Sequence, residues 1–122
     1  MREMVLLDTN FILSCVRNKI DFVEELQLSG RKILLPIQVV DELKEIVKKK
    51  KYKSKSEAEF ALKLLGHSNF EKIDLKEKYV DKGIRKFVEK NKSVIIATLD
   101  RELKRPKNRN MVITRKKKIE II

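Results

Sequence analysis

The sequence has few of the residues that characterise disulfide-rich, zinc-thiolate or membrane proteins. Its 122 residues include one cysteine, one histidine, two prolines, three glycines and no tryptophan. A single cysteine excludes an internal disulfide and a zinc site built from several cysteines. No apolar run approaches the roughly 18 residues of a membrane-spanning helix. The opening MREMVLLDTN is unlike a signal peptide, because its short apolar run ends in an acid. We therefore expect a soluble, cytoplasmic protein without a membrane partner.

The length of the chain predicts one domain spanning residues 1–122, large enough to bury a hydrophobic core. Cys15 is expected to be a small buried side chain without reactivity. His67 directly follows a glycine at a predicted helix end, and we expect it to face solvent. The aromatic side chains expected in the core are those of Phe11, Phe22, Phe60, Phe70 and Phe87.

Positive charge is what the sequence has in excess. Thirty lysines and arginines against eighteen acids give a formal net charge of +12, which favours an anionic partner such as RNA or DNA. The excess is concentrated in KKKKYKSK (48–55) and in residues 104–118, which hold eight basic residues and no acid. Lysine-rich stretches are also common as plain solvated surface, and they are typical of proteins adapted to high temperature. The clustering favours the nucleic-acid interpretation.

The candidate RNA-contacting residues are the basic side chains in or next to these two stretches. Tyr52 lies within the first stretch and could stack on a base, although an ordinary loop position is the simpler interpretation. The basic candidates are Lys48, Lys49, Lys50, Lys51, Lys53, Arg101, Lys104, Arg105, Lys107, Arg109, Arg115 and Lys116.

Strand-like and helix-like segments alternate along the chain. Helices between strands are typical of a mainly parallel sheet covered on both faces, which is a three-layer α/β/α sandwich. The run KIEII (118–122) is a candidate for a last edge strand. The other strands are expected over 3–7, 32–36, 70–75, 93–98 and 110–114, and the helices over 10–16, 20–28, 37–49, 54–66 and 78–91, with a short helix starting at DRELK.

Two acids come directly after strongly apolar strands. Asp8 follows MVLL, and Asp100 follows VIIATL. In open parallel sheets the functional side chains gather at the carboxyl ends of the strands. Taken singly, each acid is better explained as the N-cap of the helix that follows it than as a ligand.

Two further acids lie on predicted helices. Glu42 falls at the edge of the apolar stripe of the helix over 37–49, from which a side chain can reach over the end of the sheet. Asp81 lies in the first turn of the helix that precedes the strongest strand. An ordinary surface position is the alternative for Glu42, and a favourable helix-dipole interaction is the alternative for Asp81. The acids that compete with Asp81 are Asp74, Glu77 and Glu89.

Acids gathered at one end of a sheet would repel one another, and their pKa values would rise unless a cation lay between them. Mg²⁺ and Mn²⁺ take oxygen ligands and suit such a place. Two such ions about 4 Å apart can activate a water and stabilise the leaving oxygen of a phosphodiester. An acidic pocket inside a basic surface is therefore typical of metal-dependent cleavage of a polyanion.

On these residues the sequence resembles the PIN domain family of metal-dependent ribonucleases, over essentially the whole chain. Four motifs in the right order carry the resemblance, although each is weak alone. They are LLDTNFIL (6–13), LPIQVVDEL (35–43), YVDKGI (79–84) and VIIATLDRELKR (94–105).

The resemblance implies a five-stranded parallel sheet between helices, with the metal-binding acids at one end. It implies endonucleolytic cleavage of RNA by a water that Mg²⁺ or Mn²⁺ activates, leaving a 5′-phosphate and a 3′-hydroxyl. Asn10 and Thr98 are the polar residues it places beside the acids, with Thr9 as a weaker match. The implied metal-binding and catalytic acids are Asp8, Glu42, Asp81 and Asp100.

The branch of the family is a separate question. TLDRELKR, followed by a valine-containing strand and a basic tail, is similar to the PIN endonucleases that process small-subunit ribosomal RNA precursors. One cysteine makes the zinc-ribbon type of such proteins a poor match. A toxin ribonuclease paired with an antitoxin and a non-catalytic RNA-binding scaffold are the alternatives. The partners expected are structured ribosomal RNA and a second copy in a homodimer, or an antitoxin under the toxin alternative.

Overall fold

The computed structural model describes residues 2–49, 52–99 and 109–122 of the chain. Several predicted features lie outside the described residues, including the short helix expected at DRELK. The side chains of Tyr52 and Lys53 also lie outside the description. The candidate site residues outside it are Asp100, Lys50, Lys51, Arg101, Lys104, Arg105 and Lys107.

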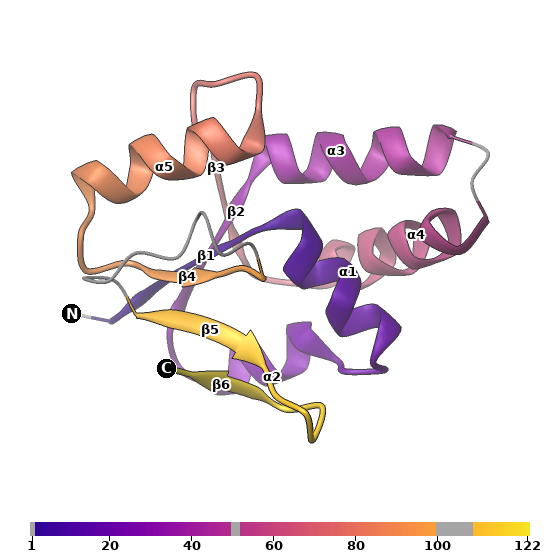
Figure 1. The fold of residues 1–122 in the computed structure, drawn as a ribbon, viewed down its shortest axis with the longest axis horizontal. Coiled ribbons are helices and arrows are strands. Elements are labelled where there is room, and N and C mark those ends of the chain that lie inside the picture. The colour runs from indigo at the N-terminus through magenta and orange to yellow at the C-terminus, as the bar shows by residue number, and fades with distance from the viewer. Residues whose placement is uncertain (1, 50–51, 100–108) are drawn as a thin grey trace.

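The described residues form one six-stranded sheet with the order β3-β2-β1-β4-β5-β6 (Figure 1). All pairs from β3 to β5 are parallel, and β6 joins β5 antiparallel. The sheet therefore has one strand more than the five that the resemblance implied, because the apolar run KIEII forms an edge strand. The strands are β1 (Met4–Leu7), β2 (Lys32–Pro36), β3 (Glu71–Ile73), β4 (Ile95–Ala97), β5 (Asn110–Ile113) and β6 (Ile119–Ile121).

Helices flank the sheet, as the alternating pattern predicted. The first four in the chain form a group in which α1 packs on α2, α3 and α4, and α3 packs on α4. The chain crosses back over the sheet between β3 and β4, so the right-handed crossover rule places α5 on the opposite face. The helices are α1 (Thr9–Arg17), α2 (Phe22–Leu28), α3 (Ile37–Lys48), α4 (Tyr52–Gly66) and α5 (Val80–Lys90).

The core lies on both faces of the central strands. Every residue of Val5–Leu7 and of Ile95–Ala97 is fully buried, which explains why these strands read as continuous apolar runs. Phe11 and Phe22 are fully buried beside them. Cys15 is also fully buried, as predicted, and the loss of hydration raises the pKa of its thiol to about 12, which disfavours the reactive thiolate.

Phe60 is the phenylalanine for which the core prediction was wrong, because its side chain is 53% exposed. The buried stripe of α4 runs through Ala58, Ala61 and Leu65. Phe60 lies about 100° around the helix from Ala61 and about 160° from Ala58, so its side chain points away from that stripe. His67 is exposed just after α4, as expected.

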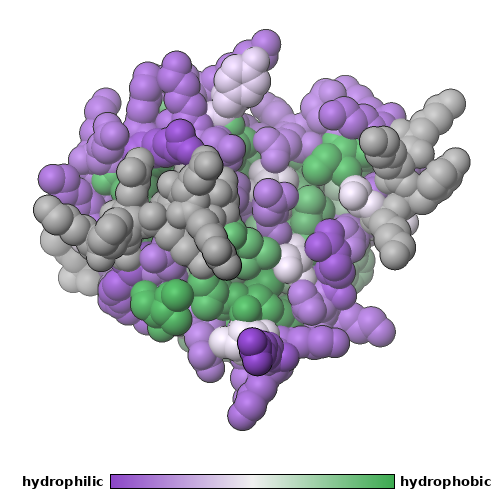
Figure 2. All heavy atoms as spheres, viewed as in Figure 1, coloured by the Kyte–Doolittle hydropathy of each residue, from purple (hydrophilic) through white to green (hydrophobic). Residues whose placement is uncertain are grey.

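Hydrophilic side chains cover most of the face seen in Figure 2, with apolar areas between them. Leu28, at the end of α2, is 80% exposed. Among the helices that the described residues form, none combines the length and the apolar character needed to cross a bilayer.

Gly83 fixes how closely α5 approaches the loop before it, and this contact generates a prediction. A Cβ at Gly83 would lie 2.8 Å from Leu75 Cβ, too close for the backbone to stay in place. Gly83→Ala is therefore expected to destabilise the fold by about 1–3 kcal/mol, although alanine favours helices. Urea denaturation measures the change.

Gly66→Ala is the matched control at the end of α4. A Cβ there would meet nothing within 4 Å, so the substitution is expected to be neutral or slightly stabilising. Equal effects of the two substitutions would contradict the role assigned to the Leu75 contact.

Candidate metal centre

The register of the two central strands brings Asp8 and Thr98 together. Leu7 on β1 pairs with Ala97 on β4, and the Asp8 N–H donates to the Ala97 carbonyl oxygen at 3.1 Å. Asp8 and Thr98 therefore leave the sheet side by side at the carboxyl ends of their strands. The Thr98 hydroxyl donates to Asp8 Oδ2 at 2.8 Å, which fixes the orientation of the carboxylate.

Asp8 is also the N-cap of α1. Its Oδ1 accepts a hydrogen bond from the Thr9 N–H at 2.8 Å, so the capping alternative is correct in geometry. An ordinary cap is hydrated, however, and Asp8 is only 3% exposed beside the fully buried Thr98. The cap position and a role in a site are therefore compatible.

Burial raises the pKa of the Asp8 carboxyl from 3.8 to about 6. The hydrogen bonds from Thr98 and from the Thr9 N–H oppose this rise, and the negative charges of Asp81 and Glu42 add to it. The chain thus keeps a poorly hydrated carboxylate close to two others. A bound cation would relieve this cost, because it favours the charged form of each acid.

Glu42 and Asp81 lie on helices that start near the same edge of the sheet. Leu6 on β1 pairs with Leu34 on β2, so Asp8 is level with Pro36, directly before α3. Glu42 is exposed in the second turn of α3, and Asp81 is exposed in the first turn of α5. Figure 1 shows α1 and α3 leaving the sheet at one end and α5 starting near that end. From these two helices the negative charges of Glu42 and Asp81 act on the carboxyl of Asp8.

The acids that competed with Asp81 are engaged elsewhere. Asp74 Oδ1 accepts hydrogen bonds from the Gln38 side chain at 2.8 Å and from the Lys76 N–H at 2.7 Å; the second of these is the main cause of its lowered pKa. Glu77 pairs with Lys86 and Lys82, and the Lys86 hydrogen bond is the main cause of its lowered pKa. These two carboxylates brace the loop before α5. Glu89 is exposed near the end of that helix, away from the site.

The donors present suit a hard divalent cation. Thr9 Oγ1 is buried beside Asp8 without a hydrogen-bond partner among the described residues, and Asn10 is exposed in the same turn of α1. Carboxylate and hydroxyl oxygens are the ligands that Mg²⁺ and Mn²⁺ prefer. Within residues 2–49, 52–99 and 109–122, no three acidic, histidine or cysteine side chains are arranged closely enough to hold a metal by themselves. The fourth predicted acid, Asp100, lies outside those residues.

The described RNA-binding candidates fall at three places. Lys48 and Lys49 lie at the end of α3, six and seven residues beyond Glu42, and Lys48 is 3.7 Å from Glu45. Arg109 pairs with Glu3 at the start of β5, the edge of the sheet opposite Asp8. Arg115 and Lys116 are exposed in the turn between β5 and β6, at the same edge as Asp8.

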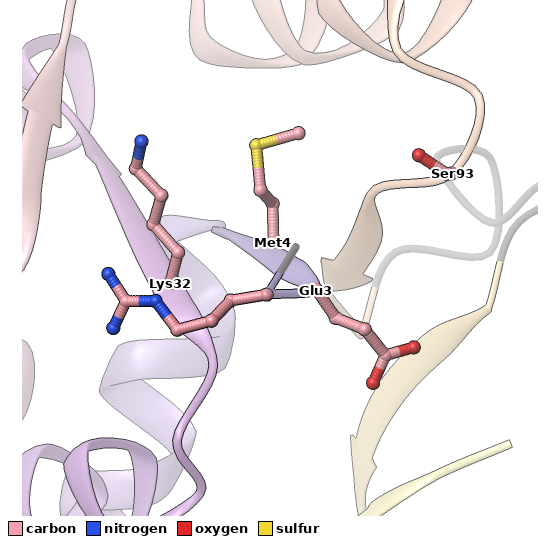
Figure 3. Close-up of a pocket in the computed structure, with 5 residues that line it drawn as sticks. Glu3, Met4, Lys32 and Ser93 are labelled. Atoms are coloured by element: carbon pink, nitrogen blue, oxygen red, sulfur yellow. The ribbon is translucent and has the colours of Figure 1, made fainter.

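A pocket of about 530 Å³ lies at the opposite edge of the sheet from Asp8 (Figure 3). Glu3, Met4, Lys32 and Ser93 border it, together with Arg2. Glu3 is held there by Arg31 at 3.1 Å and by Arg109. Because ligands of open parallel sheets bind at the carboxyl ends of the strands, this pocket is not the candidate site.

The comparison with protein families decides the assignment. A family model described as a PIN-like domain matches residues 5–118. The chain belongs to the PIN-like domain family. All four motifs on which the resemblance rested lie within the matched residues.

Two relatives of this PIN-like domain are similar over nearly its whole length. "Ribonuclease VapC4" of Methanocaldococcus jannaschii is 31% identical over 121 residues, which cover 93% of this chain and 92% of that protein. The solved structure titled "Structure of the PIN domain endonuclease Utp24" superimposes with a TM-score of 0.76 at 26% identity and covers 97% of this chain and 90% of that one.

One feature of the site in this PIN-like domain had no signal in the sequence, and a second was only weakly indicated. Gln38 donates to Asp74 and accepts from the Leu75 N–H at 3.2 Å, so it ties the start of α3 to the loop before α5. The second is Thr9, the weaker match in the resemblance, whose buried hydroxyl has no hydrogen-bond partner among the described residues. Both depend on contacts across the fold, which local patterns do not contain.

The raised pKa of Asp8 predicts how stability depends on pH without metal. The folded state, with a pKa of about 6, binds the proton more tightly than the unfolded chain at 3.8. Asp8 therefore contributes its full stabilisation of the folded state below about pH 4, where it is protonated. This contribution falls between about pH 4 and 6 and remains small above about pH 6. Asp8→Asn, which does not titrate, is expected to be more stable than wild type above pH 6 by up to about 3 kcal/mol.

Urea denaturation in EDTA across this pH range measures the difference, which should vanish near pH 4. Asp41→Asn is the control, because Asp41 is exposed on α3 and should leave the pH dependence unchanged. A constant difference between wild type and Asp8→Asn at all pH values would refute the assignment.

Proposed function

We propose that this protein is an endoribonuclease that depends on Mg²⁺ or Mn²⁺, with Asp8, Glu42, Asp81 and Asp100 as its metal ligands. The observation that carries the proposal is the buried carboxylate of Asp8. Its pKa is raised to about 6, and the charges of Asp81 and Glu42 act on it. The membership in the PIN-like domain family and the names of the two relatives support a nuclease. The place of Asp100 in the ligand set rests on the sequence.

The residues of the chain prepare the site before any substrate arrives. Thr98 and the Thr9 N–H each hold one oxygen of Asp8, so the carboxylate has one orientation and keeps lone pairs for a cation. Glu42 and Asp81 are exposed, so their carboxylates are accessible to a substrate from solvent. A bound divalent ion would supply an activated water and would stabilise the charge on the phosphate.

The net charge of +12 also supports the proposal. An acidic site alone would repel a polyanion, and the basic excess offsets this by attracting the RNA backbone. Lys48 and Lys49, at the end of α3, lie about 9 Å along the helix axis from Glu42. RNA contacts there would act beside the metal site and not within it.

Cleavage assays test this function directly. Wild type is expected to cut a structured RNA in Mn²⁺ or Mg²⁺ and to be inactive in EDTA. Asp8→Asn and Asp81→Asn are expected to lower the rate at least about a hundredfold, since they remove proposed metal ligands. Asp41→Asn should retain the wild-type rate.

A binding measurement separates loss of metal from loss of fold. Mn²⁺ without RNA should stabilise the wild type, by about 2.7 kcal/mol at a hundred times its Kd, and should stabilise Asp8→Asn much less. Cleavage that persists in EDTA or in Asp8→Asn would disprove the metal mechanism. RNA binding without cleavage in any metal would instead favour a non-catalytic scaffold.

For the biological substrate we propose ribosomal RNA precursors. The resemblance of TLDRELKR (98–105) to the PIN endonucleases that process ribosomal RNA and the net charge of +12 support this branch. The second candidate is the toxin ribonuclease of a toxin–antitoxin pair, which the 31% identity to Ribonuclease VapC4 supports.

Two readouts separate these branches. A processing enzyme is expected to cut precursor ribosomal RNA at one defined position when the new 5′ ends are mapped, and its expression should be tolerated. A toxin is expected to arrest growth when expressed, to be neutralised by the product of an adjacent small gene, and to lose this effect in Asp8→Asn. Growth arrest relieved by such a neighbour would overturn the ribosomal assignment.

A further inference from the structure

The turn between β5 and β6 carries a dense group of free cations. Arg115, Lys116, Lys117 and Lys118 are consecutive and exposed, and none of them forms an ion pair with a carboxylate of the described residues. Some other basic residues are paired: Arg17 pairs with Glu57, and Lys32 pairs with Glu71. We call residues 115–118 the basic turn.

The backbone of the basic turn is a tight hairpin loop. The Thr114 N–H donates to the Lys118 carbonyl oxygen at 2.8 Å, and the Lys117 N–H donates to the Thr114 carbonyl oxygen at 2.9 Å. Lys117 has φ +58°, the left-handed conformation that such three-residue loops normally give to glycine. A lysine there costs stability relative to glycine. Fold stability alone therefore does not account for the lysine.

The basic turn projects beyond the edge of the sheet where Asp8 lies. Leu7 is level with Ala97, and Ala97 is level with Met111. Asp8 is therefore level with Val112, two strands away. With strands about 4.8 Å apart and about 3.3 Å per residue, Lys116 lies roughly 15 Å from Asp8. Figure 1 shows this turn beyond the strand ends, on the side of the sheet away from β3.

We propose that the basic turn binds the phosphate backbone of the RNA substrate, on the β5 side of the metal site. This proposal rests on the proposed ribonuclease function. The separation of roughly 15 Å corresponds to the length of about four or five stacked nucleotides of an RNA strand. The contact therefore lies outside the nucleotides being cut. The antiparallel β6 then has a clear role, because it holds the second end of the turn.

The test is RNA binding in EDTA, where no metal-dependent cleavage can occur. Lys117→Gly removes one charge and also relieves the backbone strain, so the fold should be at least as stable as wild type. Its affinity for a fluorescein-labelled RNA hairpin is nevertheless expected to fall about three- to tenfold. The slope of log affinity against log salt should shrink by about 0.7 to 0.9.

Lys76→Gly is the matched control. Lys76 is exposed, has the same φ of +58°, and lies on the opposite flank of the sheet, after β3. Its charge acts on Asp74, whereas Lys117 has no such partner among the described residues. Lys76→Gly should therefore bind RNA within about twofold of wild type. The combined substitution of Arg115, Lys116 and Lys118 by serine should lower the salt slope by about two to three.

The outcomes separate this proposal from the proposed function. Three outcomes would overturn the role of the basic turn. Lys117→Gly could bind RNA with the affinity and salt slope of wild type, or Lys76→Gly could lose as much affinity as Lys117→Gly. The third outcome is that wild type does not bind RNA. Weaker binding in Lys117→Gly supports that role even if no metal produces cleavage, in which case the ribonuclease proposal alone fails. If wild type cleaves RNA but Lys117→Gly binds RNA as tightly as wild type, the ribonuclease proposal stands and the role of the basic turn fails.

Discussion

The site depends on one hydrogen bond between two side chains at the ends of the central strands. Thr98 donates to Asp8 at 2.8 Å, and this bond exists because β1 and β4 pair with Leu7 level with Ala97. A shift of one residue in that register would turn the side chains of β4 to the other face of the sheet. The fully buried residues of both strands prevent such a shift. Core packing therefore fixes the orientation of the carboxylate.

Much of this arrangement could be predicted from the sequence, because it follows from local patterns. The apolar runs predicted the central strands, and the position of Asp8 directly after MVLL predicted that it lies at a strand end. The positions of Glu42 and Asp81 on their helices also followed from helical periodicity. Their nearness to Asp8 did not, since it depends on how α3 and α5 lie against the sheet. The exposed Phe60 shows the same limit, because three small or aliphatic residues already fill the buried stripe of α4.

The charges of the molecule are divided between two tasks. Most acids near the site brace the structure: Asp74 and Glu77 hold the loop before α5 through Gln38, Lys82 and Lys86. Glu3 holds Arg31 and Arg109 at the far edge. Among the described residues, Asp8, Glu42 and Asp81 form no ion pair, and neither do the four cations of the basic turn. This separation leaves both groups available to a ligand.

The edges of the sheet limit how copies of this chain can associate. Both edge strands in the described structure, β3 and β6, are three residues long, and each carries charged side chains such as Lys72 and Glu120. Short, charged edges offer few backbone groups to another strand and disfavour pairing between molecules. A homodimer built by joining two sheets would gain little from such contacts. Pairing of edge strands is therefore a poor route to self-association of this chain.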